Sequence, residues 1–314
     1  MITLYLVLPC FNEELVIIDT AKKLEQFMNK QIYQGIISEQ SRVCFVDDGS
    51  TDMTWSLIEE SCRENRLFTG VKLVGNRGHQ NALLAGMMSV RDKCDAVVTL
   101  DADLQHDIEV IPRFVELYEQ GYEVVYGVRQ SRKGEKLFKR LTGDAFYRIM
   151  RIAGAKVIKN HADYRLMGKK ALALLDRYEE SNLFLRGIIP ELGFKSTTVV
   201  YEEKPRLAGE SKYSLGKMMM LALNGITSFS IRPLRLIGVL GMLFFFLSIV
   251  MFIYSLIVYC QGKIVPGWTS LVAPIWMIGG IQLLAIGILG EYIGKVYIET
   301  KHRPRYEIDK QIMQ

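Results

Sequence analysis

The stretch Ala96-Val-Val-Thr-Leu-Asp-Ala-Asp-Leu-Gln105 decides the fold of this chain, because it joins a short apolar run to two acids. Residues 96–100 read as a buried strand, and Asp101 and Asp103 follow where that strand would end. Ligands of an open parallel sheet bind beyond the carboxyl ends of its strands, so both acids would face a crevice. Carboxylates two residues apart in an extended segment share a face and suit Mg2+ or Mn2+. Because paired acids in a turn are often only solvated, this interpretation needs support from neighbouring segments.

Short apolar runs alternate with helical patterns through the first 230 residues. Such alternation predicts a parallel sheet with helices on both faces. The expected strands are residues 4–8, 43–46, 71–74, 96–100 and 124–126, and the expected helices are residues 14–29, 52–64, 80–90 and 108–119.

Polar turns follow the first three of these strands and should converge on the crevice of Asp101. They are residues 9–13, 47–52 and 75–81. The second turn has a purely structural explanation in part, because Gly49 allows a tight turn and Ser50 or Thr51 could cap the following helix. The adjacent acids Asp47 and Asp48 are harder to explain in that way, and an acid at a strand end can accept hydrogen bonds from a nucleotide. A simple dinucleotide-binding fold is disfavoured, because neither a G-x-G-x-x-G after the first strand nor a P-loop motif occurs.

Two long uncharged segments occupy the last third of the chain, and Lys263 is the only charged residue between Arg235 and Glu291. Residues 236–259 and 271–290 each reach the roughly 20 residues that cross a hydrocarbon core. Their glycines and proline are tolerated in membrane helices. Two buried helices of a globular core are the alternative, but these would need unusually long uncharged runs.

The predicted organisation has four parts. Residues 1–212 form the α/β domain, residues 213–235 a juxtamembrane amphipathic segment, residues 236–297 two transmembrane helices and residues 298–314 a basic tail. Basic residues flank the hairpin, so the positive-inside rule places the N-terminal domain and both termini in the cytoplasm. Five cysteines without Cys-x-x-Cys spacing argue against a zinc site or a disulfide framework. The net charge of +5 does not indicate nucleic-acid binding, because the basic residues cluster near the predicted membrane end.

Seven segments resemble the polyprenyl-phosphate glycosyltransferases of glycosyltransferase family 2, which include bactoprenol glucosyltransferases and dolichol-phosphate mannosyltransferases. They are Val7-Leu-Pro-Cys-Phe-Asn-Glu13, Val46-Asp-Asp-Gly-Ser-Thr-Asp52, Asp101-Ala-Asp-Leu-Gln105, Asp163-Tyr-Arg-Leu-Met167, Leu185-Arg-Gly187, Gly209-Glu-Ser-Lys-Tyr213 and Gly290-Glu-Tyr-Ile-Gly294. They occur in the family's order over nearly the whole chain, and the last resembles the bacterial bactoprenol branch. The resemblance implies a GT-A-type nucleotide-binding domain with a mostly parallel sheet, plus a C-terminal two-helix transmembrane hairpin in the bacterial cytoplasmic membrane.

The reaction implied by the resemblance is an inverting hexose transfer from a nucleotide diphosphate sugar to undecaprenyl or another polyprenyl phosphate, for modification of a cell-surface glycan. UDP-glucose is the expected donor. UDP-N-acetylglucosamine and GDP-mannose stay open, because a single hydrogen bond to a hydroxyl or acetamido group can decide the choice. Association into a homo-oligomer also stays open.

The same resemblance assigns residues to the site. The nucleotide-sugar-binding residues would be Pro9, Phe11, Glu13, Asp48 and Asp101. Asp103 would be the main metal ligand and a catalytic residue, with Asp101 and Gln105 assisting, and the cofactor would be Mg2+ or Mn2+. Asp163, the second catalytic candidate, is either a general base or a positioning residue that orients Arg165 or a sugar hydroxyl. The second role stays open because an acceptor phosphate, with a second pKa of about 6, needs little help from a base.

Cations for the lipid phosphate would come from two segments, because arginine forks suit phosphate oxygens. The acceptor-binding residues implied by the resemblance are Arg129, Arg140, Arg206, Ser211 and Lys212. The alternative is that these charges form a solvated face, or contact lipid head groups beside the membrane.

Two other classes of protein stay open. A processive polysaccharide synthase would usually carry a Gln-x-x-Arg-Trp segment and more membrane spans, and this sequence has neither. A catalytically inert membrane adaptor would not need its acids, yet Asp48, Asp101, Asp103 and Asp163 are all intact.

Overall fold

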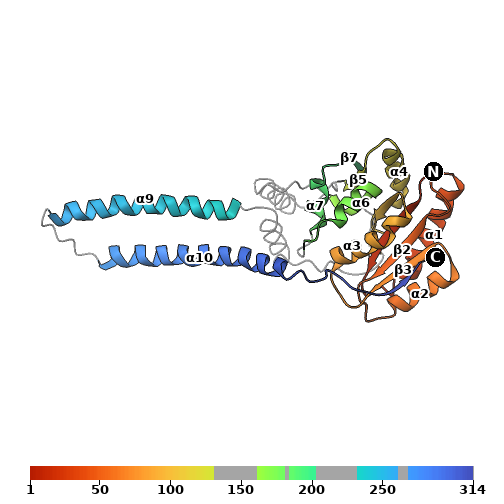
Figure 1. The fold of residues 1–314 in the computed structure, drawn as a ribbon, viewed down its shortest axis with the longest axis horizontal. Coiled ribbons are helices and arrows are strands. Elements are labelled where there is room, and N and C mark those ends of the chain that lie inside the picture. Colours follow the sequence, from red (N-terminus) through yellow and green to blue (C-terminus); the bar gives the residue numbers. More distant parts are fainter. Residues whose placement is uncertain (131–160, 181–183, 203–231, 261–267, 314) are drawn as a thin grey trace. The chain divides into compact units, whose positions relative to one another are not determined.

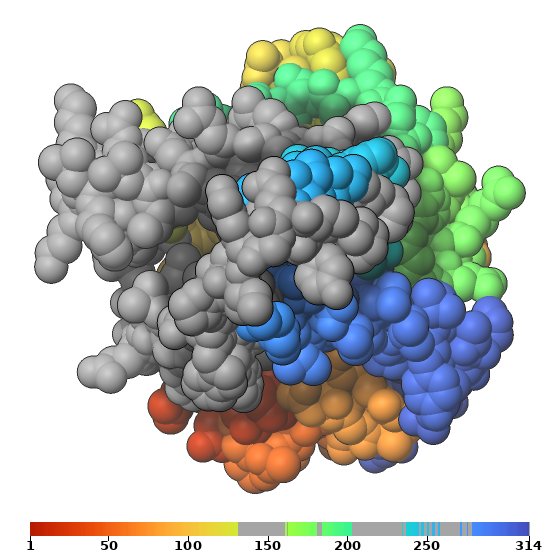
Figure 2. Space-filling model, turned by 90° about the vertical axis from the view of Figure 1, so that its left-hand side faces the viewer, coloured from red at the N-terminus to blue at the C-terminus, as the bar shows by residue number. Residues whose placement is uncertain are grey.

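A computed structural model of the chain describes residues 1–130, 161–180, 184–202, 232–260 and 268–313. Figure 1 shows these residues as coloured ribbons, and Figure 2 shows the remaining residues in grey. The chain divides into two units. One consists of Met1–Tyr147, Lys156–Ser214 and Arg303–Gln314, and the other of Arg148–Ala155 and Leu215–His302.

The first unit is built on an eight-stranded sheet with the order β7-β5-β6-β4-β1-β2-β3-β8. The strands are β1 (Leu4–Cys10), β2 (Arg42–Asp47), β3 (Phe68–Leu73), β4 (Ala96–Thr99), β5 (Val124–Arg129), β6 (His161–Gly168), β7 (Ser196–Tyr201) and β8 (Ile308–Ile312). The central strands β4, β1, β2 and β3 are parallel, and β7 is parallel to β5. β6 lies antiparallel between β4 and β5. The predicted mostly parallel α/β sheet is confirmed, and the five predicted strands correspond to β1 to β5.

Helices cover both faces of this sheet, as predicted. They are α1 (Ile17–Tyr33), α2 (Thr54–Glu64), α3 (His79–Val90), α4 (Ile111–Glu119), α6 (Lys169–Asp176) and α7 (Leu185–Glu191), with short 3-10 turns at Arg91–Lys93 and Ile108–Val110. Helices α1, α2 and α4 bury their apolar sides in one core with the even-numbered residues of β1. Helix α3 packs on the opposite face, where Gly86 lies against Val7 and Val46. Because both faces are covered, β1 is apolar along its whole length rather than alternating.

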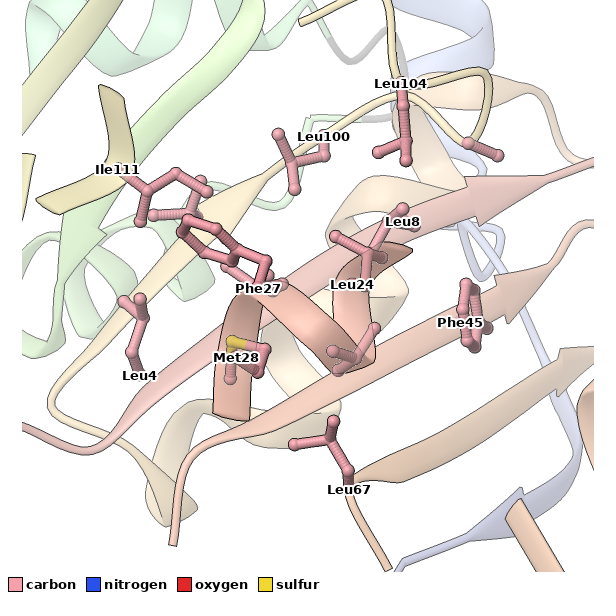
Figure 3. Close-up of a cluster of buried hydrophobic side chains, with 14 of the residues drawn as sticks. Leu4, Leu8, Leu24, Phe27, Met28, Phe45, Leu67, Leu100, Leu104 and Ile111 are labelled. Atoms are coloured by element: carbon pink, nitrogen blue, oxygen red, sulfur yellow. The ribbon is translucent and has the colours of Figure 1, made fainter. Parts of the chain in front are cut away.

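The core on the α1 face reaches the acidic turn after β4. Figure 3 shows Leu24, Phe27 and Met28 of α1 among Leu8, Leu100 and other buried side chains, with Leu104 in the same cluster. Leu104 is only 8% exposed, although the polar residues beside it are partly open to solvent. Full burial of a leucine contributes about 1.5–3 kcal/mol, so Leu104 anchors this turn to the core.

The end of the chain returns to the sheet. Residues Ile308–Ile312 form β8, which pairs antiparallel with β3 and extends that edge of the sheet. The Val74 amide donates to the Glu307 carbonyl at 3.0 Å, directly beyond the paired residues. The predicted basic tail, residues 298–314, is therefore corrected in part. Its strand was not indicated by the sequence pattern, because Ile-Asp-Lys-Gln-Ile has only two apolar residues.

The second unit contains helices α9 (Arg232–Cys260) and α10 (Trp268–Thr300), which lie side by side in Figure 1. Within the described residues, Ile278–Thr300 is long and apolar enough to cross a membrane, and it overlaps the second predicted span. The first predicted span, residues 236–259, lies within α9, where many side chains are outside the described part of the chain, so this span stays a prediction. Large apolar side chains such as Phe246 and Leu283 are exposed along both helices. Exposed apolar surface of this kind marks a site that interacts with another protein or with a membrane.

Gly86 offers a test of how closely α3 packs on the sheet. A Cβ atom at Gly86 would lie 2.5 Å from the γ-carbons of both Val7 and Val46, and valine side chains are stiff. We expect Gly86→Leu to destabilise the domain by about 3 kcal/mol, more than the roughly 1 kcal/mol gained by replacing a helical glycine. The thermal unfolding midpoint should drop clearly below that of Ser89→Leu, a half-buried position on the same helix. Equal midpoints would contradict the packing.

Candidate active site

Two predicted turns meet at the carboxyl ends of the neighbouring strands β1 and β2. The Asn12 amide donates to Ser50 Oγ at 3.0 Å, and the Thr51 amide donates to Asn12 Oδ1 at 2.9 Å. Asn12 has a φ of 54°, a left-handed conformation that asparagine tolerates better than most residues. These hydrogen bonds hold residues 9–13 and 47–52 together, and their convergence on Asp101 stays a prediction.

Asp48 fastens the third turn to the other two. Its Oδ1 accepts from the Arg77 amide at 2.7 Å, and its Oδ2 accepts from the Gly78 amide at 2.9 Å. The side chain is 3% exposed, and burial raises its pKa although the two amides act in the opposite direction. Asp48 thus holds residues 75–79 beside the crevice, and its role in nucleotide binding stays a prediction.

The acidic turn after β4 presents its polar side chains on one side. Ala102 and Leu104 are buried, whereas Asp101, Asp103 and Gln105 are partly exposed. The alternation is held by the Thr20 hydroxyl, which donates to the Ala102 carbonyl at 2.7 Å, and by a left-handed φ of 48° at Leu104. The exposure alternates every two residues as predicted, but residues 101–104 form a turn, closed by the Leu104 amide donating to the Asp101 carbonyl at 3.2 Å, and not the predicted extended segment.

Oxygen-bearing side chains on an open face suit a divalent cation. Asp103 Oδ1 also accepts from the Gln105 amide at 3.2 Å, which holds this carboxylate within its own turn. In the described part of the chain, no group of three or more His, Cys, Asp or Glu side chains could enclose a metal ion. The residues fit a cation such as Mg2+ or Mn2+ that takes its other ligands from water and substrate phosphate.

Two histidines flank Asp101. His79 Nε2 lies 3.7 Å from its Oδ1, and His106 Nε2 lies 3.6 Å from its Oδ2. His106 is buried, stacks on Tyr164 at 4.8 Å between ring centroids, and accepts from the Asp101 amide through Nδ1 at 3.3 Å. His106 therefore forms the wall behind Asp101.

Asp163 lies on β6, the strand next to β4. The Thr99 hydroxyl of β4 donates to the Asp163 carbonyl, and the Asp163 side chain is 5% exposed. Its carboxylate is surrounded by donors from three elements, β6, α3 and α7. These are Arg165 Nη2 at 2.5 Å, Arg186 Nη2 at 3.0 Å, His79 Nε2 at 3.5 Å and Gln80 Nε2 at 3.5 Å.

The charges around Asp163 decide its protonation. Burial alone would raise its pKa, but Arg186, His79 and Arg165 together hold the pKa well below the usual range. The same interaction raises the pKa of His79 against the opposing effect of burial. A carboxylate with a depressed pKa, and with both oxygens engaged by cations, is a weak proton acceptor. Of the two roles considered for Asp163, positioning fits this geometry better than general base.

The other predicted site residues fall into two groups. Phe11 and Glu13 lie in the first turn, Pro9 lies within β1, and Arg129 ends β5 with a partly exposed side chain. The predicted acceptor residues Arg140, Arg206, Ser211 and Lys212 lie outside the described residues.

The sequence patterns indicate no role for Gln80 or Arg186, and His79 appears in them only as part of a turn, whereas Arg165 is named as a residue that Asp163 could orient. All four contact Asp163. The motif Leu185-Arg-Gly187 was a signal for Arg186, but local patterns did not indicate its partner.

A GT-A-like domain, with acids at the end of its fourth strand, defines the class of nucleotide-sugar glycosyltransferases. Glycosyl transferase family 2 matches residues 5–180, and the GtrB C-terminal hairpin matches residues 232–296. The chain belongs to glycosyl transferase family 2, and it is a glycosyltransferase.

Relatives match over nearly the full length. The glycosyltransferase YkoT of Bacillus subtilis (strain 168) is 51% identical over 98% of this chain and 91% of its own. The bactoprenol glucosyl transferase of Shigella phage SfV is 37% identical over 96% of this chain and 97% of its own. The crystal structure of mannosyl-3-phosphoglycerate synthase from Rubrobacter xylanophilus shares the fold with a TM-score of 0.50, at 14% identity over 76% of this chain and 75% of that one.

Replacing Asp163 should change stability in a pH-dependent way. Asp163→Asn leaves Arg165 buried without its counter-charge, which should cost about 3–5 kcal/mol at neutral pH. The folded-state pKa lies below the unfolded value of about 3.9, so the carboxylate's contribution is complete above that value and is lost as pH falls through the folded pKa. Thermal unfolding from neutral pH to about pH 3 should therefore show a steeper loss in the wild type than in the variant. Parallel curves would contradict this account.

Asp48 should matter for the third turn. Asp48→Ala leaves the Arg77 and Gly78 amides without their acceptor. Each amide that water does not reach should lower the free energy of unfolding by about 1–3 kcal/mol. We expect a lower unfolding midpoint than for Asp92→Ala, whose side chain is 78% exposed. Differential scanning fluorimetry of both variants measures the difference, and a midpoint equal to that of Asp92→Ala would show that water replaces the carboxylate.

Proposed function

We propose that this glycosyltransferase transfers a hexose from a nucleotide diphosphate sugar to a polyprenyl phosphate. The turn Asp101–Gln105 carries the proposal for the donor half, because its polar side chains are partly exposed and Asp101 lies 3.7 Å from His79 at the end of the third turn. The acceptor half is supported by the bactoprenol glucosyl transferases that match over the full length, and by the matching hairpin.

In the proposed reaction, an oxygen of the acceptor phosphate attacks the anomeric carbon of the sugar. The bond from that carbon to the diphosphate oxygen breaks, the nucleoside diphosphate leaves with the electron pair, and the configuration at the anomeric carbon inverts. A divalent cation bound by Asp103 and Asp101, with help from Gln105, would stabilise the charge that develops on the leaving diphosphate.

The protein's own residues position the reactants in this scheme. Phe11 and Glu13 lie in the turn beside the proposed nucleoside pocket, and Asp48 holds the opposite loop in place. Asp163 orients the guanidinium groups of Arg165 and Arg186 and does not accept a proton. A base is not needed, because the acceptor phosphate is already mostly a dianion at neutral pH. Arg129 is a candidate for the acceptor phosphate.

The proposed donor is UDP-glucose, with UDP-N-acetylglucosamine as the next choice. The proposed location is the bacterial cytoplasmic membrane, with the α/β domain and both chain termini in the cytoplasm. A cytoplasmic location is supported by the basic residues that flank the uncharged segments. A site in the cytoplasm, next to the membrane, would have access both to soluble nucleotide sugars and to the phosphate of a membrane lipid.

The reaction can be tested with purified protein, undecaprenyl phosphate, Mg2+ or Mn2+, and a panel of labelled UDP- and GDP-sugars. Label should pass from one donor into the organic extract, and chelation of the metal should stop it. Asp103→Asn should lower turnover on the order of 100-fold or more, the range for losing one group that stabilises transition-state charge. Asp92→Asn, an exposed acid on the turn Arg91–Lys93, is the matched control and should retain activity.

Two results would count against this proposal. Full activity of Asp103→Asn would remove the metal assignment. The absence of lipid-linked label from every donor would favour a polysaccharide synthase or an inert adaptor instead.

A further inference from the structure

His106 directly follows the acidic turn, but its side chain is buried. That side chain is 5% exposed, whereas the side chain of Asp101 is 40% exposed. Buried polar atoms need hydrogen-bonding or charged partners, so both nitrogens of a buried imidazole have to be explained. The reaction as described so far gives His106 no task beyond closing the wall behind Asp101.

Aromatic contacts fix the plane of the His106 ring. The ring stacks on Tyr164 with 4.8 Å between centroids and 15° between planes, and it meets the Tyr201 ring edge-on at 5.6 Å. Tyr164 is held in turn, because its hydroxyl donates to the Asp107 carbonyl at 2.9 Å and its ring lies 4.9 Å from that of Phe114. The three rings around and behind the imidazole come from β6, β7 and α4, so it cannot rotate without repacking of these elements.

Both nitrogens of this fixed ring approach one residue, Asp101. Nδ1 accepts from the Asp101 amide at 3.3 Å, and Nε2 lies 3.6 Å from Asp101 Oδ2. A ring nitrogen that accepts carries no hydrogen, so the hydrogen of the imidazole is on Nε2, beside the carboxylate. The 3.6 Å distance is longer than a hydrogen bond, but an N–H dipole still attracts a carboxylate where the dielectric constant is low. His106 therefore holds Asp101 at its backbone and at its side chain.

The two acids of the turn are held by different means. Asp103 Oδ1 accepts from the Gln105 amide at 3.2 Å, so its own turn orients it. The Asp101 carboxylate lies between two imidazoles, with His106 at Oδ2 and His79 at 3.7 Å from Oδ1. The His79 side chain is 43% exposed, so the buried ring of His106 is the more rigid of the two supports.

We propose that His106 is a positioning residue whose Nε2–H holds the Asp101 carboxylate in place for a divalent cation. A group that supports a ligating carboxylate restricts its rotation, so less conformational entropy is lost when the cation binds. His106 itself is buried and acts only through Asp101. The inference rests on the proposed function for the cation, and it adds a supporting residue behind the predicted metal ligands.

Two substitutions separate the nitrogens of His106. In His106→Asn, the amide oxygen can take the position of Nδ1 and accept from the Asp101 amide, while Nε2 is lost. In His106→Gln, the amide nitrogen can take the position of Nε2 beside the carboxylate, while the acceptor is lost. Both remove the ring from its aromatic contacts, so each variant is the control for the packing lost in the other.

His106→Phe is the complementary variant, because it keeps an aromatic ring and removes both nitrogens. Asp92→Asn, an exposed acid on the turn Arg91–Lys93, is the reference variant. Binding of Mn2+ to the full chain in detergent is measured with and without UDP, from the decrease in the electron paramagnetic resonance signal of free aqueous Mn2+. The thermal unfolding midpoint of each variant is measured alongside, and no step requires sugar transfer.

Loss of Nε2 should weaken Mn2+ binding. We expect the affinity to fall by about 10- to 100-fold in His106→Asn and in His106→Phe, the range for removing a group that supports a metal ligand. His106→Gln should bind Mn2+ more tightly than His106→Asn, although both should unfold at a lower temperature than the wild type. Recovery of the affinity without recovery of stability distinguishes positioning from packing.

The proposal is overturned if His106→Asn and His106→Phe bind Mn2+ as Asp92→Asn does. It is also overturned if His106→Asn and His106→Gln lose affinity equally, because His106 would then only fill space. If His106→Asn does not fold, His106→Phe carries the comparison, since it keeps the stacked ring, and wild-type affinity in that variant would overturn the proposal.

Failure of the inference and failure of the proposed function give different results. Tight binding of Mn2+ by the wild type and by every variant removes only the role of His106. A wild type that binds no Mn2+, with or without UDP, removes the metal assignment and this inference together. Mn2+ binding that depends on Nε2, without transfer from any sugar donor, supports the inference and counts against the proposed reaction.

Discussion

The arrangement of the crevice depends on the buried carboxylate of Asp163. It lies on β6 and draws together Arg165 of the same strand, Arg186 of α7, and His79 and Gln80 of α3. A buried charge is tolerated only when it is paired and hydrogen-bonded, so each of these partners is constrained by the others. The low pKa of Asp163 follows from that arrangement and explains why it suits positioning better than proton transfer.

Packing of the buried residues of the acidic turn fixes the position of its partly exposed polar side chains. Ala102 and Leu104 enter the core of the α1 face, and the Thr20 hydroxyl fixes the carbonyl between the two acids. The left-handed backbone at Leu104 is unfavourable for a leucine by itself, and it persists because burial of the side chain offsets it. Binding groups on a loop are therefore positioned by the same apolar contacts that stabilise the sheet.

Some strands could be recognised from the sequence and others could not, depending on whether their residues are apolar and whether their partner strands lie nearby in the sequence. Strands β1 to β4 are buried on both faces and appear as apolar runs, so their existence follows from composition. Strand β6 was not recognised because it contains Asp163 and Arg165. Charged residues are usually exposed, but here both are buried. Strand β8 is short and mostly polar, and its partner β3 lies more than 200 residues earlier in the sequence. Its pairing is a long-range contact that no local periodicity indicates.

The sequence by itself determined the alternation of strands and helices, the acids at the end of β4, the uncharged segments near the carboxyl end, and the family of the protein. These are properties of contiguous residues, so periodicity and spacing are enough to indicate them. Only the tertiary structure decided that Asp163 has Arg186 and His79 as partners and that Asp48 holds the loop of Arg77. Those pairs depend on the order of strands in the sheet, which brings residues together across 20 to more than 80 positions of the chain. Ionisation and hydrogen bonding respond to distance in space, and that distance exists only once the sheet has formed.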